Sequence, residues 1–342
     1  MTRPLAVFRA DAAAGIGGGH VIRSLALADA LAGNGWTCVF ATCPESLETV
    51  PALGASGHRI ISLAGADDTE SIDTALDARA DWLIVDHYGL DALFHRAARD
   101  WAERIAVIDD LADRRCDCDV LIDPTPGRTA AAWENRAPAD CRLLTGPDYA
   151  LLRPEFQRQR ERALSREESS ECRRLFVSFG FTDAGGHTLT ALEGIRRAGL
   201  RVPVDVVIGR ASIWREVILD LAVTLPYPVR IHEESANIAA IMAAADMAVG
   251  AGGGTALERC CLGLPSIVIV IAANQAANTS ALAQAGAVES LGSAEGLTAQ
   301  DVAAAVRALC ADGKRRSAMA AAARGICDGR GIQRIIQELQ KQ

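Results

Sequence analysis

A glycine-rich loop that ends in a histidine is the first feature of the chain suited to chemistry. Residues 15–20 read GIGGGH and stand between a short apolar run and a helical pattern. Glycines let the backbone approach a ligand closely, and the N-terminus of the following helix offers unpaired N–H groups to a phosphate. His20 is therefore placed either as a general base near neutral pH or as a simple helix cap or phosphate donor. The residue pattern alone leaves both roles open.

A second glycine run, GAGGGT at residues 250–255, again separates a strand pattern from a helical one. Its glycines predict a second loop that binds phosphate. Glu258 follows Thr255 by three residues, a spacing typical of a helix capping box. The other interpretation of Glu258 is a carboxylate that holds the two ribose hydroxyls of a nucleotide.

Polar residues also follow three other expected strands, at the sheet edge where ligands gather in open α/β folds. They are the Asp86-His87-Tyr88 run, Gly180 with Thr182, and Asn274 with Gln275. We interpret the lone His87 as a structural histidine. Asn274 is either a ligand contact or the N-cap of the next helix.

Neither a metal nor a cofactor is expected. A dinucleotide site calls for an acidic residue about 20 positions after its glycines, and Cys43-Pro44-Glu45 is a poor match. The ten cysteines lack the C-x-x-C spacing of zinc or redox sites. Asp117-Cys118-Asp119 spells a D-x-D motif of metal-dependent enzymes, but it precedes a strand, and we interpret it as incidental.

Short β-branched runs alternate with alanine- and leucine-rich stretches, a pattern typical of parallel sheets built from βαβ units. We expect strands at residues 5–9, 37–41, 59–63, 82–86, 105–109 and 120–123, then at 175–179, 204–208, 229–232, 247–249 and 267–271. The clearest helix covers residues 21–32, and the last one lies near 332–339. These elements predict an α/β fold of two Rossmann-like domains whose parallel sheets face each other across a cleft.

The length of 342 residues favours two domains. We place the first at residues 1–152 and the second at 175–328. Residues 153–174 are rich in Arg, Glu, Gln and Ser, and they are expected to form an exposed helix or linker between the two.

Composition narrows the choice of partners. A net charge of −8 disfavours nucleic acid, because an acidic chain repels a phosphate backbone. The apolar run at residues 5–8 is too short for a membrane span or an export signal. We therefore expect a cytoplasmic monomer with free thiols that binds neither nucleic acid nor membrane.

Five segments together resemble one family over nearly the whole chain. They are residues 8–11 (FRAD) with 17–20 (GGGH), 86–91 (DHYGLD), 149–156 (YALLRPEF), 258–265 (ERCCLGLP) and 274–275 (NQ). Their order is similar to that in the UDP-sugar hydrolases of the pseudaminic acid pathway. Those enzymes remove UDP from UDP-2,4-diacetamido-2,4,6-trideoxy-β-L-altropyranose, have the GT-B fold, and resemble the peptidoglycan glycosyltransferase of the MurG type.

The resemblance implies a metal-independent UDP-sugar hydrolase. His20 matches the base that activates water to attack the anomeric carbon and expel UDP with inversion, and Tyr88 and Asn274 match residues near the sugar and the water. The expected substrate contacts are Arg9, Asp11, Gly18, Gly19, Arg23, Gly180, Thr182, Gly252, Gly253, Gly254, Thr255, Glu258 and Gln275. Asp11 is left with two roles, orienting His20 or meeting an acetamido group. The GT-B fold also implies that the C-terminal helix, within residues 329–342, crosses back to the first domain.

The chain departs from the family at Phe181, where a glycine is usual, and at Ala272-Ala273, where relatives often carry a more polar residue. These positions bear on which sugar is bound. One rival function is a GT-B glycosyltransferase, which would use the same base on an acceptor hydroxyl. A lipid-linked transferase would need an apolar membrane-facing patch, for which Trp36 and Phe40 are weak candidates. The other rival is a sugar-nucleotide binder without activity.

Overall fold

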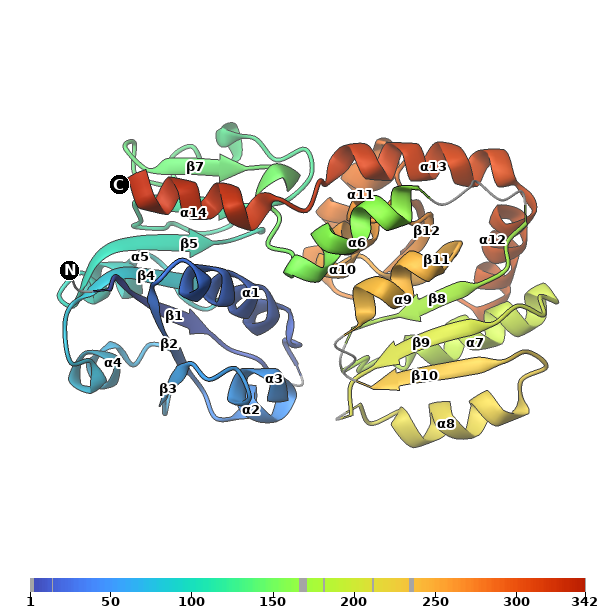
Figure 1. The fold of residues 1–342 in the computed structure, drawn as a ribbon, viewed down its shortest axis with the longest axis horizontal. Coiled ribbons are helices and arrows are strands. Elements are labelled where there is room, and N and C mark those ends of the chain that lie inside the picture. The colour runs from blue at the N-terminus through green and yellow to red at the C-terminus, as the bar shows by residue number, and fades with distance from the viewer. Residues whose placement is uncertain are drawn as a thin grey trace. The chain divides into compact units, whose positions relative to one another are not determined.

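The structure, a computed structural model, describes residues 3–13, 15–165, 171–180, 182–210, 212–233 and 237–341. It divides into two compact units, Met1–Arg153 with Arg330–Gln342, and Pro154–Gly329. Each unit is an open parallel sheet with helices packed on it (Figure 1). The predicted α/β class with two Rossmann-like domains is therefore confirmed.

The first unit is a seven-stranded parallel sheet with the order β3-β2-β1-β4-β5-β6-β7. Its strands are β1 Leu5–Ala10, β2 Thr37–Thr42, β3 Arg59–Ser62, β4 Ala80–Asp86, β5 Ala102–Ile108, β6 Val120–Asp123 and β7 Arg142–Thr145. Its helices are α1 Gly19–Gly33, α2 Glu45–Thr49, α3 Pro51–Gly54, α4 Thr69–Ala75, α5 Ala92–Ala98 and α14 Gly331–Lys341, with 3₁₀ turns η1 Ala130–Trp133 and η2 Pro147–Tyr149. The strand order reverses between β1 and β4, the position where open α/β sheets bind ligands.

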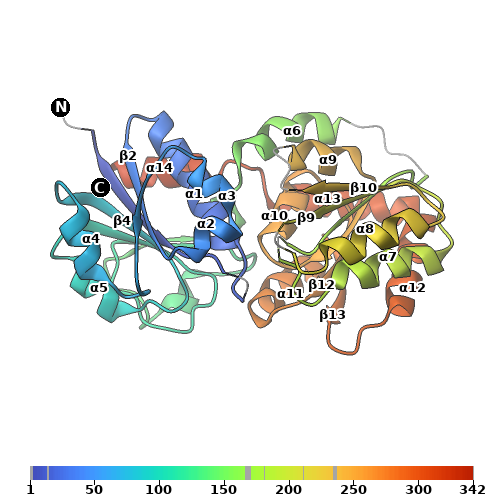
Figure 2. The same ribbon diagram turned by 90° about the horizontal axis from the view of Figure 1, so that it is seen from below.

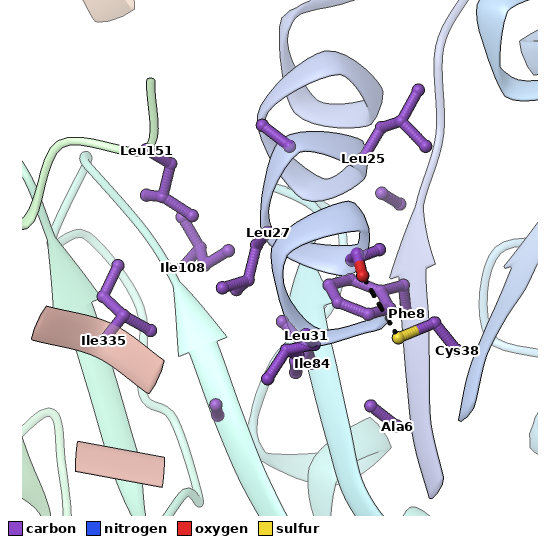
Figure 3. Close-up of a cluster of buried hydrophobic side chains, with 14 of the residues drawn as sticks. Ala6, Phe8, Leu25, Leu27, Leu31, Cys38, Ile84, Ile108, Leu151 and Ile335 are labelled. Carbon is purple, nitrogen blue, oxygen red and sulfur yellow. Dashed lines mark hydrogen bonds between the residues drawn. The ribbon is translucent and has the colours of Figure 1, made fainter. Parts of the chain in front are cut away.

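The first unit has two hydrophobic cores, and one of them lies between the sheet and α1 (Figure 3). Phe8 and Ile84 from the strands meet Leu27 and Leu31 from α1 there. The helix forms because apolar residues recur along one face, and the sheet buries that face. This packing fixes the start of α1, and with it the position of His20.

The C-terminal helix α14 belongs to the first unit. Ile332, Ile335, Ile336 and Leu339 recur at helical spacing and are all buried in the core that contains Leu27. The helix lies against α1 and η2 (Figure 1). Burial of this apolar stripe therefore explains why the last residues of the chain pack in the first unit rather than in the second.

The second unit is a six-stranded parallel sheet with the order β10-β9-β8-β11-β12-β13. Its strands are β8 Leu175–Ser178, β9 Val204–Ile208, β10 Val229–Glu233, β11 Met247–Ala251, β12 Ser266–Val270 and β13 Glu289–Ser293. Its helices are α6 Pro154–Leu164, α7 His187–Ala198, α8 Arg215–Thr224, α9 Ile238–Ala244, α10 Gly254–Cys261, α11 Ala276–Gln284, α12 Ala299–Ala311 and α13 Gly313–Ile326, with the 3₁₀ turn η3 Ala273–Gln275.

Helices cover both faces of the second sheet. Ile195 of α7, Ile218 of α8 and Val302 of α12 share one buried cluster with the strands. Figure 2 shows these helices together, with α6 and α9 on the other side of the sheet. The order reverses between β8 and β11, so the loops that follow these two strands lie at the expected ligand position.

Two strands have no counterpart among those expected from the sequence. β7 and β13 lie at the outer edges of their sheets and are largely exposed or half-buried. An edge strand has one unpaired side and needs no long apolar run, so its sequence signal is weak.

The expected linker also differs from the structure. Its first part forms α6, which packs on α9 and α10 within the second unit. Arg160 of α6 donates hydrogen bonds to the carbonyls of Cys261, Arg324 and Cys327, at the ends of α10 and α13. Residues 166–170 of the expected linker lie outside the described residues.

Trp36 and Phe40 do not form an apolar surface. Both side chains are buried in the core beside α1. The described part of the chain contains no helix long and apolar enough to span a membrane.

His95 of α5 makes the stability of the first unit depend on pH. Its side chain is fully buried, Nδ1 accepts from the N–H of Asp117 at 3.2 Å, and Nε2 has no hydrogen-bond partner among the described residues. Burial lowers the pKa of His95 to about 4, although Asp117 and Asp91 act to raise it and Arg114 and Arg99 add to the decrease. The unfolded chain therefore binds this proton more tightly, and stability should fall as pH falls from about 6.5 to about 4.

We expect a loss of up to about 3 kcal/mol from this residue across that window. His95→Asn is the matched variant, because its amide oxygen can still accept from the N–H of Asp117 but does not titrate. Urea unfolding at several pH values measures the difference between the two proteins. If both lose stability in parallel between pH 6.5 and 4, His95 is not the titrating group.

Candidate active site

His20 is hydrogen-bonded to a buried carboxylate. Its Nδ1 lies 2.6 Å from Oδ1 of Asp86, which is the last residue of β4 and pairs with Ala10 of β1. The loop after β1 and the end of β4 therefore meet where the strand order reverses. Asp86 is fully buried, and burial alone would raise its pKa, but Arg23 and His20 outweigh that effect and hold its pKa well below the usual range.

An ionised Asp86 fixes the tautomer of His20. The carboxylate can only accept, so Nδ1 of the neutral imidazole carries the proton and Nε2 keeps its lone pair. An imidazole in this state can take a proton from water or from a hydroxyl group. This geometry supports the base role for His20 over a role as helix cap, because His20 is already the second residue of α1 and its Nδ1 faces Asp86.

Arg23, also expected to contact the substrate, binds two carboxylates of the first unit. Its Nε and Nη2 donate to the two oxygens of Asp86, each at 2.6 Å, and Nη1 donates to Asp110 at 3.0 Å. Arg23 lies three residues after His20, so both side chains lie on the same face of α1. The guanidinium therefore holds the carboxylate that holds His20.

Tyr88 supports the other side of the histidine. Its hydroxyl donates to Asp110 at 2.5 Å, and its ring meets His20 edge-on with the ring centres 4.4 Å apart. The guanidinium of Arg114 lies 5.7 Å from the centre of the Tyr88 ring. His20 is thus held through Nδ1 and along its ring.

Arg9 and Asp11 form a buried ion pair rather than a binding surface. Arg9 is fully buried and donates to both carboxylate oxygens of Asp11, at 2.8 and 2.6 Å. Asp11 also accepts from the Thr42 hydroxyl at 3.0 Å and from the N–H of Cys43 at 2.8 Å. The two expected substrate contacts therefore brace the loops after β1 and β2. Asp86, not Asp11, orients His20.

His87 has partners for both ring nitrogens, which fits its interpretation as a structural histidine. Nδ1 accepts from the N–H of Gly89 at 3.0 Å, and Nε2 lies 3.3 Å from Asp11. A histidine engaged at both nitrogens has no free lone pair for catalysis.

The second glycine loop lies between β11 and α10. Gly253 precedes α10 and, within the part of the chain that the structure describes, no side chain caps this helix. The N–H groups of Gly254 and Thr255 thus begin the helix at its positive end, an arrangement suited to a phosphate. Gly18 and Gly19 begin α1 in the same way.

Gln275, expected as a substrate contact, supports this loop. Its side-chain oxygen accepts from the N–H of Gly252 at 3.1 Å and from the N–H of Ile271 at 3.2 Å. Asn278 donates to the carbonyl of Gly252 at 2.6 Å. The amide side chains of η3 and α11 therefore set the path of the glycine loop.

Gly252 is needed because no room exists for a side chain. A Cβ at this position would lie 2.0 Å from Oγ1 of the buried Thr279. We expect Gly252→Ala to destabilise the second unit by about 1–3 kcal/mol, as other overpacked sites do. The control is Gly254→Ala, where a Cβ has no neighbour within 4 Å and alanine favours the helix. Thermal unfolding of both variants checks the prediction, and equal melting temperatures would contradict it.

The capping-box interpretation of Glu258 is wrong. α10 begins at Gly254 with Gly253 as its N-cap, so Thr255 is already the second helical residue. Oγ1 of Thr255 lies 3.3 Å from a guanidinium nitrogen of the buried Arg259. Glu258 is buried in the second half of α10. The ribose role of Glu258 stays a prediction.

The remaining predicted residues lie at the same edge of the second sheet. Gly180 follows β8 with a φ of 91°, a backbone conformation that favours glycine, and Thr182 is half-buried. Phe181 lies outside the described residues. Asn274 is exposed in η3 and is not the N-cap of α11, which is Gln275. β8, β11 and β12 are neighbours, so the loops that contain these residues start from adjacent strand ends.

The D-x-D motif serves the fold, which agrees with its interpretation as incidental. Arg99 donates to Asp117 at 3.1 Å and to Asp119 at 2.7 Å, before the start of β6. Among the described residues, no group of three or more His, Cys, Asp or Glu side chains is placed to hold a metal. All ten cysteines are free thiols.

Sequence reasoning missed the partners of the predicted residues. Asp86 and Asp110 bind His20, Arg23 and Tyr88, and Asn278 binds the second glycine loop. A signal existed for the two carboxylates, because each ends or follows a predicted strand on the ligand side of the sheet.

The fold is similar to that of known protein structures. The structure matches that of MurG from Acinetobacter baumannii with a TM-score of 0.65 and 18% identity, over 99% of this chain and all of that one. Together with the two Rossmann-like units, this likeness defines the GT-B fold. Residues 216–339 match the model of the glycosyltransferase family 28 C-terminal domain.

Curated relatives are distant. The spore coat polysaccharide biosynthesis protein SpsG of Bacillus subtilis is 28% identical over 58% of this chain and 58% of its own length. The UDP-2,4-diacetamido-2,4,6-trideoxy-β-L-altropyranose hydrolase of Campylobacter jejuni is 25% identical over 52% of this chain and 60% of its own length. The chain thus spans somewhat more than half the length of the curated relatives that it matches.

Proposed function

We propose that this chain hydrolyses a UDP-activated diacetamido sugar, with UDP-2,4-diacetamido-2,4,6-trideoxy-β-L-altropyranose as the preferred substrate. The observation that supports it most is the hydrogen bond from Nδ1 of His20 to the ionised, buried Asp86, because it leaves Nε2 as a base. The five segments that resemble the pseudaminic acid pathway hydrolases, and the distant likeness to the Campylobacter jejuni enzyme, support the choice of sugar.

In the proposed reaction, Nε2 of His20 removes a proton from water while the water oxygen attacks the anomeric carbon. The bond between that carbon and the UDP oxygen breaks, and its electron pair leaves with UDP. The resulting imidazolium is stabilised by Asp86 through Nδ1. General-base catalysis of this kind contributes about 10²–10⁴-fold.

The leaving group gains negative charge as the bond breaks. The N–H groups of Gly254 and Thr255 at the start of α10 are the proposed site for its phosphates, and they stabilise this charge without rearrangement. Gln275 and Asn278 fix the loop before α10 in advance. The second unit thus binds UDP in this proposal, and the first unit supplies the base.

Transfer of the sugar to an acceptor is the second candidate function, and the match of residues 216–339 to a glycosyltransferase domain favours it. The two functions differ in whether an acceptor for the sugar is required. The purified protein should release UDP and free sugar from the altropyranose nucleotide with no acceptor present. Release only after an acceptor is added, or conversion to an epimeric UDP-sugar, would contradict the hydrolase proposal.

Glu258 is the proposed ligand of the UDP ribose. A carboxylate forms charge-assisted hydrogen bonds to hydroxyls, each worth about 1.5–3 kcal/mol, and an amide of the same shape forms weaker ones. We therefore expect Glu258→Gln to bind UDP at least several-fold more weakly and to distinguish UDP from 2′-deoxy-UDP less than wild type does. Titration calorimetry measures both ligands. Unchanged UDP affinity in a folded variant would remove Glu258 from the ribose site.

A further inference from the structure

Three charged side chains lie behind His20, and the proposed mechanism uses Asp86 but neither Arg23 nor Asp110. Asp86 accepts from His20 and twice from Arg23, and Arg23 also reaches Asp110. With a neutral imidazole, the two carboxylates and one guanidinium carry one net negative charge. When His20 takes a proton, the group becomes neutral.

We propose that Arg23 and Asp110 are positioning residues that set the charge state of His20, with Arg23 keeping the resting imidazole neutral and Asp110 stabilising the imidazolium that forms during the reaction. This inference rests on the proposed role of His20 as the base. It assigns Arg23 to the base rather than to the substrate.

The balance of charge explains why both residues are required. A buried carboxylate beside a histidine favours the imidazolium, and a histidine that is already protonated cannot act as a base. Two carboxylates without Arg23 would place two negative charges near His20 and favour protonation strongly. Arg23 without Asp110 would leave no net charge beside a neutral His20, and proton uptake would then create an uncompensated positive charge.

The geometry requires arginine at position 23. Its planar fork meets both oxygens of Asp86 at 2.6 Å and still reaches Asp110 with a third nitrogen at 3.0 Å. The ammonium of a lysine cannot make the two parallel bonds of this fork. The fork also occupies both oxygens of Asp86, which keeps that carboxylate aligned with Nδ1 of His20.

The neighbouring charges are already paired with each other. Arg114 lies 2.5 Å from Asp109, and Arg128 lies 2.8 Å from Asp123. Arg128 also donates to the backbone carbonyl of Asp110 at 2.8 Å, and Tyr88 donates its hydroxyl to the Asp110 carboxylate. Ser24, which carries no charge, donates its hydroxyl to Asp86 at 3.4 Å. Arg23 and Asp110 are thus the charges that the Asp86–His20 pair experiences most directly.

Two charge-changing variants should shift the pH dependence in opposite directions. Arg23→Gln should move the acid limb of the kcat/KM profile to higher pH by about one unit or more, because protonated His20 is favoured. Asp110→Asn should move the same limb to lower pH by a similar amount. The double variant restores one net negative charge, and its limb should return close to that of wild type. A merely structural role would lower activity without this pattern.

The closing experiment is a titration of the His20 ring by NMR in substrate-free protein labelled with ¹⁵N-histidine. The chain has six histidines, and His20→Asn assigns the signal. We expect a resting ring protonated at Nδ1, and titration midpoints that fall in the order Arg23→Gln, then wild type and the double variant together, then Asp110→Asn. Equal midpoints, or shifts of both single variants in the same direction, would overturn the inference.

A substitute variant and a measurement of hydrolysis complete the experiment. Arg23→Gln leaves Asp86 buried with less compensation. If that variant unfolds, Arg23→Lys replaces it, because lysine keeps the positive charge without the planar fork. Arg23→Lys should titrate like wild type yet have a lower kcat, while Asp110→Asn alone must still shift downward. If the titration midpoints follow the expected order but the protein hydrolyses no UDP-sugar, the proposed function is refuted and the roles of Arg23 and Asp110 stand. Hydrolysis without the order would refute the charge assignment alone.

Discussion

Replacing His20 with alanine is expected to lower kcat at least 100-fold while UDP affinity changes little. The imidazole is the proposed base, and its hydrogen bond to Asp86 leaves Nε2 to accept the proton of water. The proposed UDP contacts lie on α10 in the second unit, whereas His20 lies on α1 in the first. Steady-state kinetics and UDP calorimetry on the same preparation separate the two effects.

The control for this prediction is His20→Asn. An asparagine amide can donate to Asp86 in place of Nδ1 but offers no basic nitrogen. It should therefore be about as inactive as His20→Ala while staying folded. A kcat within tenfold of wild type in either variant would exclude His20 as the base.

The second large effect is expected for Asp86→Asn, with kcat at least 100-fold below wild type. The neutral amide cannot stabilise the imidazolium that forms when His20 takes a proton, and in either orientation its NH₂ group faces an N–H donor of Arg23. The variant should also be less stable, because the buried guanidinium of Arg23 loses a charged partner. Reading kcat on folded protein, verified by circular dichroism, separates catalysis from stability.

Asp123→Asn is the matched control for Asp86→Asn. Asp123 is equally buried and ends the nearby strand β6, and its side-chain contacts among the described residues are with Arg128, Thr125 and Trp133 rather than with His20. Its replacement should cost stability and change kcat by no more than a few-fold. Similar kcat values for the two variants would mean that Asp86 acts only through the fold.

Much of the fold was predictable because its signals are local. Buried parallel strands are runs of β-branched residues, and α1 carries its apolar face in consecutive turns, so the central strands and this helix stand out in the sequence. The edge strand β13 has the sequence ESLGS and owes its place to pairing with β12. No local pattern could have indicated it.

The parts of the candidate site that lie in the two glycine-rich loops could be predicted from the sequence. Glycines at the start of a helix identify both loops, and His20 stands out because it ends one of them. Its partner Asp86 is 66 residues away in sequence, and only the pairing of β1 with β4 brings the two together. Which carboxylate meets which cation is a property of the sheet, so the sequence alone does not pair Arg9 with Asp11 or Arg23 with Asp86.

Glu258 shows how a correct local pattern can fail. Thr255 and Glu258 have the spacing of a capping box, but Gly253 is already the N-cap and the helix begins at Gly254. A true box occurs at Thr298 and Asp301, where the threonine is the N-cap of α12. The motif has meaning only relative to the first helical residue, and glycine runs obscure that position.

Hydrolysis of the UDP-altropyranose substrate in water enriched in oxygen-18, without an acceptor, tests the central claim most directly. Water activated by His20 attacks the anomeric carbon in this account, so mass spectrometry should find one heavy oxygen in the free sugar and none in UDP. The anomeric hydroxyl of the free sugar also exchanges its oxygen with the solvent, so the products are read at early times and compared with unlabelled sugar held in the same water. Heavy oxygen in the UDP phosphate, or no free sugar at all, would contradict the account.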